Sequence, residues 1–176
     1  RDRVGLVTFD HDIVEYVPPS MKHLDTILHL LDRASAGRAG SLREPLIKIT
    51  ELLGRKGIVV IISDLYERPE EVLNSISLLR ARGHDVIVFH ILDPAELSFP
   101  FEDSSSFEDL ETREQIPVIP NRLRDDYKRL VAEHVESVQR RLTENRIDYV
   151  LLDTSKPLDL ALFQYLLARE RWTRKR

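Results

Sequence analysis

Short apolar runs alternate with amphipathic stretches along most of this chain. The runs are rich in valine, isoleucine and leucine, which predicts strands at residues 4–9, 58–63, 85–92 and 147–152. Between and after them, apolar residues recur at three- and four-residue steps, which predicts helices near 24–31, 46–53, 69–82, 121–142 and 157–166. Strands that alternate with helices predict a three-layer α/β/α sandwich around a mostly parallel, Rossmann-like sheet.

Two segments depart from this alternation. Residues 13–17 read as the returning strand of a hairpin after 4–9, which predicts one antiparallel edge strand, and Pro18 and Pro19 end it before a helix capped by Ser20. Residues 94–120 contain several prolines and predict an irregular excursion with a small hairpin near 105–119. No linker or internal repeat interrupts the chain, so residues 1–176 are expected to form a single domain.

The most informative run is residues 58–63, which is almost purely β-branched and ends in Ser63 and Asp64. A strand that is apolar on both faces suits the centre of a parallel sheet. Ligands of such sheets bind just beyond the carboxyl ends of the strands, which is where Ser63 and Asp64 are expected. Asp64 is therefore a candidate to coordinate a cation or orient a ligand, although it could also be a solvated turn residue.

Other acids have related positions. Asp93 and Asp153 also follow predicted strands, so Asp64, Asp93 and Asp153 are expected along one edge of the sheet. If they converged on one ion, the chain could be a metal-assisted hydrolase of the phosphoryl-transfer type. If they only capped helices, the domain would be purely structural. The turn at residues 10–12 carries two aspartates and a histidine, which are potential metal ligands but are more often a solvated turn.

Composition narrows the possible functions. The 176 residues carry a net charge of −4, which argues weakly against general nucleic-acid binding. The absence of cysteine excludes disulfides, thiolate metal sites and cysteine nucleophiles. No Walker A loop, GxGxxG, GxSxG or HExxH pattern occurs, and His90 and His134 lie in apolar patterns that suit core or boundary positions. The chain opens at Arg1 directly before an apolar run, which suggests a piece of a longer protein.

Several of these segments resemble a known family. Residues 1–9 resemble the second strand of a von Willebrand factor type A domain, and residues 59–65 resemble its fourth strand with the aspartate that follows. The rest of the chain is closer to one bacterial branch, the family called domain of unknown function 58. The features that carry this likeness are Asp93-Pro94-Ala95-Glu96, Asp109-Leu110-Glu111-Thr112, Tyr127, the segment 147–154 with Pro157-Leu158, and Leu166-Leu167-Ala168-Arg169.

The resemblance implies a metal-ion-dependent adhesion site at the top of the sheet. Such a site uses an Asp-x-Ser-x-Ser motif after the first strand, a threonine in a later loop and an aspartate after the fourth strand. Here Asp64 matches the aspartate and Ser41 stands near the position of the threonine, while the first motif would precede Arg1. An incomplete, empty site is therefore expected in this chain, with no bound cofactor, and Mg²⁺ or Mn²⁺ is expected only in the complete protein.

The resemblance also implies a function. Members of this family resemble partners of MoxR-type AAA+ ATPases in chaperone-like assemblies, so a non-enzymatic protein-interaction domain in the cytoplasm is expected, with a membrane tether outside this chain as one arrangement. The interaction surface would include Asp10, Ser63, Asp64 and Asp93. In the family the first strand lies between those at 4–9 and 58–63. Without it, these edges are expected to close on each other, to accept a segment of a second copy, or to dimerise edge to edge.

Overall fold

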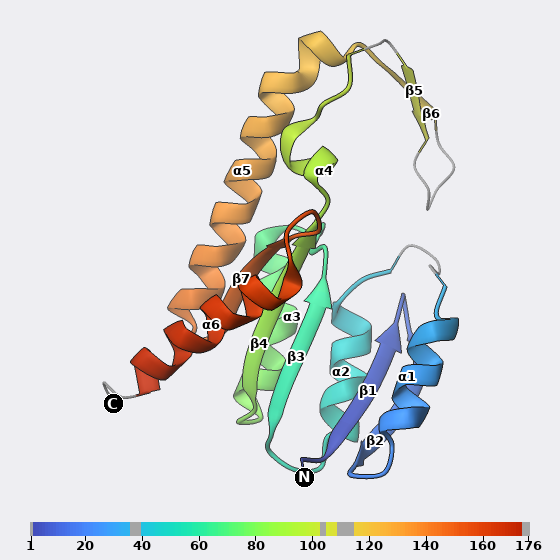
Figure 1. Cartoon of the computed structure of the whole chain (residues 1–176), viewed down its shortest axis with the longest axis vertical. Helices are drawn as coiled ribbons and strands as arrows, with labels where there is room; N and C mark the ends of the chain where they lie inside the picture. The colour runs from blue at the N-terminus through green and yellow to red at the C-terminus, as the bar shows by residue number, and fades with distance from the viewer. Residues whose placement is uncertain (1, 36–39, 103–104, 109–114, 174–176) are drawn as a thin grey trace.

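The computed structural model describes residues 2–35, 40–102, 105–108 and 115–173 and has a mixed α/β fold. Three strands form a parallel sheet in the order β3-β4-β7, with β3 spanning Ile58–Ser63, β4 Asp85–Leu92 and β7 Asp148–Asp153. A separate antiparallel pair consists of β1, Val4–Phe9, and β2, Ile13–Ser20 (Figure 1). The predicted α/β class, parallel pairing and antiparallel strand are confirmed, but the strands form separate sheets.

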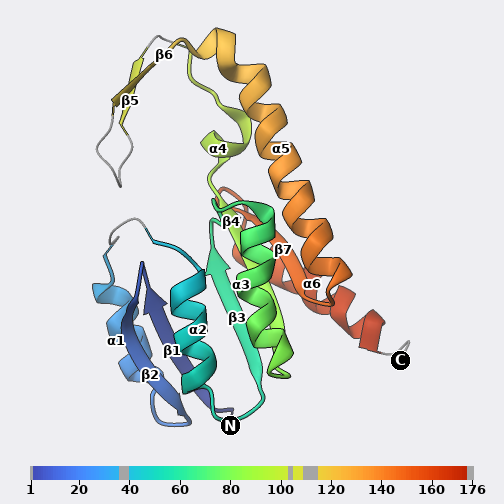
Figure 2. The ribbon, with the colours of Figure 1, turned by 180° about the vertical axis from the view of Figure 1, so that it is seen from behind.

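The helices lie on both sides of the parallel sheet. Helices α2, α3 and α5 lie on one side of it and α6 lies on the other, as Figures 1 and 2 show from opposite directions. The helices are α1 Leu24–Arg33, α2 Arg43–Leu52, α3 Pro69–Ala81, α4 Pro94–Ser98, α5 Pro120–Glu144 and α6 Leu158–Thr173.

The core lies between the sheet and helices α2, α3 and α5. Most of its deeply buried side chains come from β4 and from the facing helices, and they include Leu46, Val72, Ile76, Leu79, Val86, Val88, Val138 and Leu142. Strand β4 lies between two partners, with Val88 opposite Ile61 of β3 and Tyr149 of β7. Because β4 is buried on both faces, a continuous apolar run suits it.

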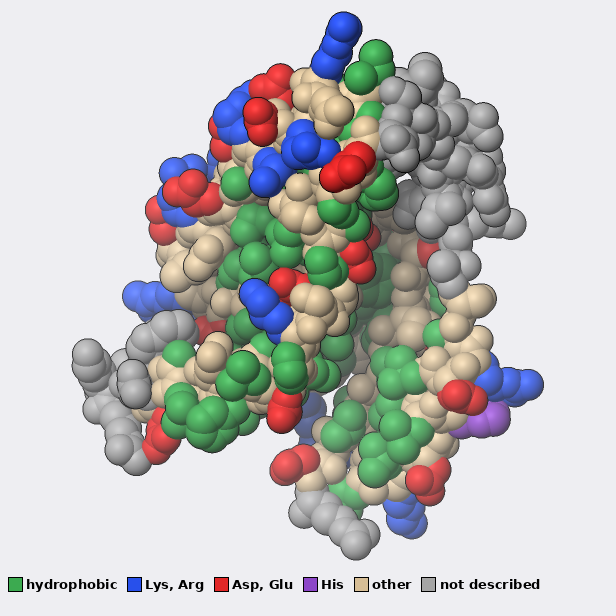
Figure 3. Space-filling view, turned by 45° about the horizontal axis from the view of Figure 1, so that its top comes forward, with side chains coloured by type: hydrophobic (Ala, Val, Ile, Leu, Met, Phe, Trp, Pro, Cys, Tyr) green, Lys and Arg blue, Asp and Glu red, His purple; other side chains and the backbone are tan. Residues whose placement is uncertain are grey.

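Strand β3 is covered on one face only. Ile61 is 4% exposed and belongs to the core, whereas its neighbours Ile62 and Val60 are 63% and 47% exposed on the opposite face. Strands β1 and β3 point the same way in Figure 1, and they do not pair with each other. Of the three alternatives for these edges, closure on each other is therefore wrong. Figure 3 shows hydrophobic side chains on both sides of the hollow between the β1–β2 pair and the parallel sheet.

Three details of the sequence-based assignment need correction. Strand β2 continues through Pro18 and Pro19 to Ser20, so Ser20 ends a strand and α1 begins after His23. Among the residues that the structure describes, β2 pairs only with β1. Proline is tolerated at such an edge because no second strand there needs its N–H. A short helix, α4, occupies part of the predicted irregular excursion.

The excursion also contains the predicted hairpin. Strand β5, Ser105–Glu108, pairs antiparallel with β6, Gln115–Val118. Residues 109–114, between these two strands, lie outside the described residues. Within the part of the chain that the structure describes, no helix combines the length and apolarity needed to cross a membrane.

Candidate functional site

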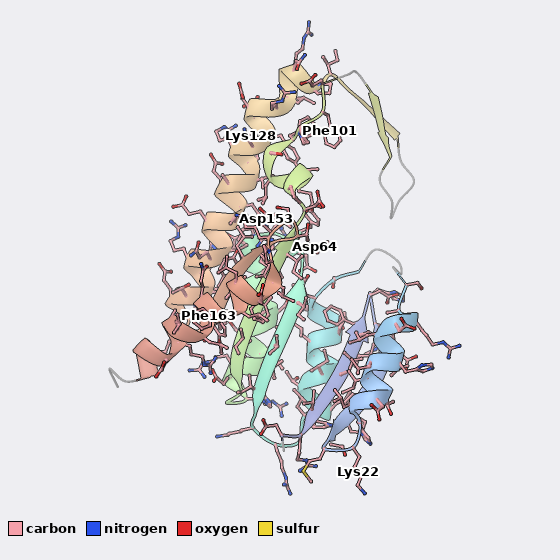
Figure 4. All side chains as sticks on the ribbon, in the orientation of Figure 1. Lys22, Asp64, Phe101, Lys128, Asp153 and Phe163 are labelled. Carbon is pink, nitrogen blue, oxygen red and sulfur yellow. The ribbon has the colours of Figure 1, made fainter. Side chains whose placement is uncertain are left out.

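Four of the residues predicted from the sequence line one cavity at the carboxyl ends of β1 and β3. The cavity has a volume of about 390 Å³, and Asp10, Ser41, Ser63 and Asp64 contribute to its wall. Figure 4 shows Asp64 at the upper end of β3. We call this cavity the loop-end cavity. The structure thus brings together residues that lie up to 54 positions apart, from Asp10 to Asp64.

Gly40 allows the loop before α2 to approach β1 closely. A β-carbon at Gly40 would lie 2.5 Å from the carbonyl oxygen of Asp10, a distance at which the backbone would have to move. On the other side, the backbone N–H of Leu42 donates to Glu67 Oε1 at 2.5 Å. These two contacts hold Ser41 between the end of β1 and the loop after β3.

The backbone that follows Asp64 is held in an unusual conformation. Leu65 has φ of 50°, in the left-handed region, although its side chain is large and only 1% exposed. A non-glycine residue adopts this region only where its surroundings stabilise it. Here His90 Nε2 donates to the carbonyl oxygen of Asp64 at 2.7 Å, and His134 Nε2 donates to that of Leu65 at 2.9 Å.

His90 is the central group of this support. Because its Nε2 donates to a carbonyl, its Nδ1 accepts the hydroxyl of Tyr149 at 2.7 Å when the ring is neutral. Burial disfavours the imidazolium and lowers the pKa of His90 to about 4. Both ring nitrogens are therefore engaged, and the neutral ring positions the Asp64 loop.

Sequence reasoning assigned His90 and His134 to core or boundary positions and missed this supporting role. The sequence offers one signal for it, a histidine within the apolar strand at Asp85–Leu92. A buried polar ring needs partners, which here are a carbonyl and a hydroxyl. The pattern could not identify those partners, because they come from other elements.

The side chains at the end of β3 interact with each other. Ser63 Oγ accepts the N–H of Leu65 at 3.2 Å and donates to Asp64 Oδ1 at 3.4 Å. The Asp64 side chain is exposed and lines the loop-end cavity. An exposed carboxylate beside hydroxyl groups can accept hydrogen bonds or coordinate a hard cation.

The turn from β1 to β2 organises its own polar groups. Asp10 Oδ1 accepts the N–H of Asp12 at 3.1 Å and lies 2.8 Å from His11 Nδ1. Asp12 pairs with Lys48 of α2 at 2.6 Å, and this ammonium group helps to lower the pKa of Asp12. Only Asp10 of these three turn residues lines the loop-end cavity.

Asp93 follows the carboxyl end of β4, at the same end of the parallel sheet as Asp64, but it does not line the loop-end cavity. Asp93 Oδ1 accepts the N–H of Ala95 at 2.8 Å, while Glu96 accepts the N–H of Asp93, which makes a capping box for α4. Helix capping is the role expected of such an acid if the domain is purely structural.

Asp153 is the last residue of β7 and lies at the same end of the parallel strands as Asp64 (Figure 4). It accepts hydrogen bonds from the backbone and the hydroxyl of Ser155, which lower the pKa of Asp153. Among the described residues, no group of three or more His, Cys, Asp or Glu side chains could hold a metal ion. The strand-end acids thus share an edge, but each has its own local contacts.

A second cavity of about 300 Å³ adjoins the first and lies against α5. Asp64 and Tyr66 line both cavities, and the second also includes His90, Glu96, Tyr127 and His134. Because its lining comes from α4, α5 and the ends of β3 and β4, we call it the α5 cavity. Sequence reasoning did not anticipate it.

Comparison with known proteins identifies one family model, described as "Protein of unknown function DUF58", which matches residues 1–137. No curated protein matches the chain. A crystal structure of the conserved hypothetical protein BatB from Bacteroides thetaiotaomicron is 14% identical, with a TM-score of 0.57 over 96% of this chain and 78% of that one.

A second crystal structure is of an aerotolerance-related membrane protein from Bacteroides fragilis NCTC 9343 carrying multiple mutations to serines. It is 16% identical, with a TM-score of 0.56 over 94% of this chain and 79% of that one. At these identities the two structures establish a shared fold.

Proposed function

Because this chain belongs to the DUF58 family of proteins of unknown function, we propose that it is a non-enzymatic protein-interaction domain that binds its partner at the loop-end cavity. The observation that carries this proposal is the assembly of Asp10, Ser41, Ser63 and Asp64 around one cavity at the ends of two strands. Ligands of parallel α/β sheets bind at this end of the strands. Loops on a rigid scaffold are also where binding residues concentrate.

A divalent cation shared with the partner would suit this cavity. Mg²⁺ and Mn²⁺ prefer oxygen ligands, and the cavity wall includes the carboxylates of Asp10, Asp64 and Glu67 together with the hydroxyls of two serines and a tyrosine. We assign Asp64 and Ser41 as the principal ligands from this chain. An octahedral ion would have open positions left over, and a carboxylate of the partner protein could occupy one of them.

The partner and the location come from the family resemblance. A MoxR-type AAA+ ATPase is the proposed partner, in an assembly that matures other proteins. A cytoplasmic domain tethered to a membrane by a segment outside this sequence is the proposed arrangement. The description of the Bacteroides fragilis neighbour as a membrane protein agrees with such a tether.

The two separate sheets also support a finer description of the fold. We propose that they are parts of one three-layer sandwich of the von Willebrand factor type A kind, with β1 and β3 facing each other across one missing strand. Among the described residues, β3 has no strand neighbour on the edge away from β4. This edge and the exposed Ile58, Val60 and Ile62 favour self-association with a second copy of this chain.

Titration with Mn²⁺ tests the ion in this mechanism. In an amide NMR spectrum, substoichiometric Mn²⁺ should broaden the signals of Ser41, Ser63 and Asp64 first, and excess Mg²⁺ should reverse the effect. Asp64→Asn should abolish the selective broadening. Asp25→Asn, at an exposed acid of α1, should leave it unchanged. Broadening that is centred elsewhere, or that survives Asp64→Asn, would remove the ion from the mechanism.

A further inference from the structure

The α5 cavity is a pocket with mixed aromatic and acidic walls. Its volume of about 300 Å³ is at the lower end of the range for ligand pockets. Tyr66 follows β3 and Tyr127 lies on α5, so two separate elements contribute aromatic rings. The ring of Phe99 packs against that of Tyr127, with 4.6 Å between the ring centroids, and so helps to hold Tyr127 in position.

The carboxylate of Glu96 is held in place within this wall. Its Oε2 accepts the backbone N–H of Asp93 at 2.8 Å, and the same carboxylate helps to raise the pKa of the nearby Tyr66 hydroxyl. Burial raises the pKa of Tyr66, so this hydroxyl keeps its proton at neutral pH. A carboxylate has about four lone-pair sites, so the bond from the Asp93 N–H leaves Glu96 able to accept from a ligand.

The charge of the lining is negative. Asp64 and Glu96 contribute carboxylates, and the residues that form this cavity wall, all of them described, include neither lysine nor arginine. His90 does not offset this charge at neutral pH, because it is neutral and both its ring nitrogens are engaged. A cationic ligand is therefore complementary to the cavity, whereas an anion would meet two like charges.

We propose that the α5 cavity receives the guanidinium group of an arginine side chain from the partner protein, with Glu96 as its carboxylate and Tyr66 and Tyr127 as its aromatic walls. Guanidinium is planar, stacks on aromatic rings and can donate two parallel hydrogen bonds to one carboxylate. It is also more weakly hydrated than ammonium, which favours its entry into a partly apolar pocket. The inference rests on the proposed protein-binding function, which supplies the arginine.

The test uses a capped amino acid, so that neither the partner nor an ion is needed. The full chain is titrated with N-acetyl-arginine methylamide in the presence of a chelator, and amide shifts are followed by NMR. Saturable shifts are expected at Tyr66, Glu96 and Tyr127. Glu96→Gln, which keeps the shape and the acceptor for the Asp93 N–H, should weaken binding at least tenfold. Glu136→Gln, at an exposed acid of α5, should not change it.

Two related probes define the specificity. The neutral isostere N-acetyl-citrulline methylamide should give no saturable shift, and the lysine analogue should bind at least fivefold more weakly than the arginine derivative. Absence of saturable shifts with arginine, equal binding of citrulline, equal binding of lysine, or no effect of Glu96→Gln would each overturn the proposal. Because no metal ion or partner takes part, failure here is distinguishable from failure of the ion-bridged interaction.

Discussion

His90 Nε2 donates a hydrogen bond of 2.7 Å to the backbone carbonyl of Asp64, which ties the centre of β4 to the loop that follows β3. The register places Ser63 opposite His90, so the side chain reaches the loop from the neighbouring strand. This bond and the one from His134 to Leu65 stabilise a left-handed residue directly after the candidate ligand. The position of the Asp64 side chain therefore depends on two histidine rings, of which His90 is fully buried and His134 is partly buried.

Protonation of His90 should destabilise the fold in mild acid. The pKa of His90 falls from 6.5 to about 4 on folding, so the unfolded chain binds more protons between these values and stability declines as pH falls. Between pH 7 and pH 5 this group alone should reduce the free energy of unfolding by about 2 kcal/mol. Urea denaturation at the two pH values measures the change.

The matched variants for this test are His90→Gln and His29→Gln. His90→Gln removes the titrating ring and should reduce the pH dependence by most of that amount. His29, on an exposed position of α1, should leave the dependence as in the unmodified chain. An equal pH dependence in the His90 and His29 variants would contradict the assigned role of His90.

Gly40→Ala should disturb the loop-end cavity, because the new β-carbon would lie 2.5 Å from the Asp10 backbone. Overpacking of this kind costs about 1–3 kcal/mol of unfolding free energy. Gly54→Ala is the control, because a β-carbon there would meet no atom within 4 Å. The amide spectrum of Gly40→Ala should shift at Asp10 and Ser41. Equal stability of the two variants would show that the close approach does not constrain the loop.

The two faces of β3 should respond differently to the same substitution. Ile61→Thr places a hydroxyl in the core and should cost about 2 kcal/mol or more, whereas Ile62→Thr, at an exposed residue, should cost under about 0.5 kcal/mol. If the exposed face and edge of β3 mediate self-association, Ile62→Thr should also reduce the dimer fraction in sedimentation velocity. A dimer fraction unchanged by Ile62→Thr would exclude this face as the contact.

Arg169 connects α6 to the parallel sheet. It pairs with Asp148 of β7 at 2.9 Å and with Asp85 of β4, and Tyr165 shares Asp148 at 2.8 Å. Arg169→Met should lower the free energy of unfolding by about 1–3 kcal/mol, because two partly buried carboxylates lose a charged donor. Hydrogen exchange should accelerate in α6.

Arg129→Met is the control for Arg169→Met. Arg129 also pairs with two acids, Asp126 and Glu133, but all three lie on the exposed surface of α5. Exposed pairs contribute about 0–1 kcal/mol, so this variant should have little effect. Similar losses in the two variants would mean that the Arg169 network does not hold α6 against the sheet.

Local sequence could predict the strands and the position of Asp64. The β-branched run at Ile58–Ser63 forms β3, and Asp64 follows it at the edge where ligands of such sheets bind. The pattern was less reliable where an element has few neighbours. On α6, apolar residues recur as the helical pattern requires, but Leu158 and Leu166 are 59% and 60% exposed, because the sheet covers only part of this helix.

Long-range contacts could not be predicted from the sequence. A glycine such as Gly40 is typical of a loop, but the sequence does not show that this loop approaches Asp10. That approach depends on how α2 packs beside β1. Likewise, the partner of His90 is a carbonyl 26 residues away, and carbonyls carry no sequence signal. The α5 cavity combines residues from four elements, so it becomes recognisable only in the folded structure.

Binding of the MoxR-type AAA+ ATPase from the same organism tests the central claim most directly. Its affinity should be measured by biolayer interferometry in Mg²⁺ for the unmodified chain, Asp64→Asn and Asp25→Asn. The account predicts that the unmodified chain and Asp25→Asn bind equally and that Asp64→Asn binds at least tenfold more weakly. No binding by the unmodified chain, or equal binding by Asp64→Asn, would contradict an interaction surface centred on Asp64.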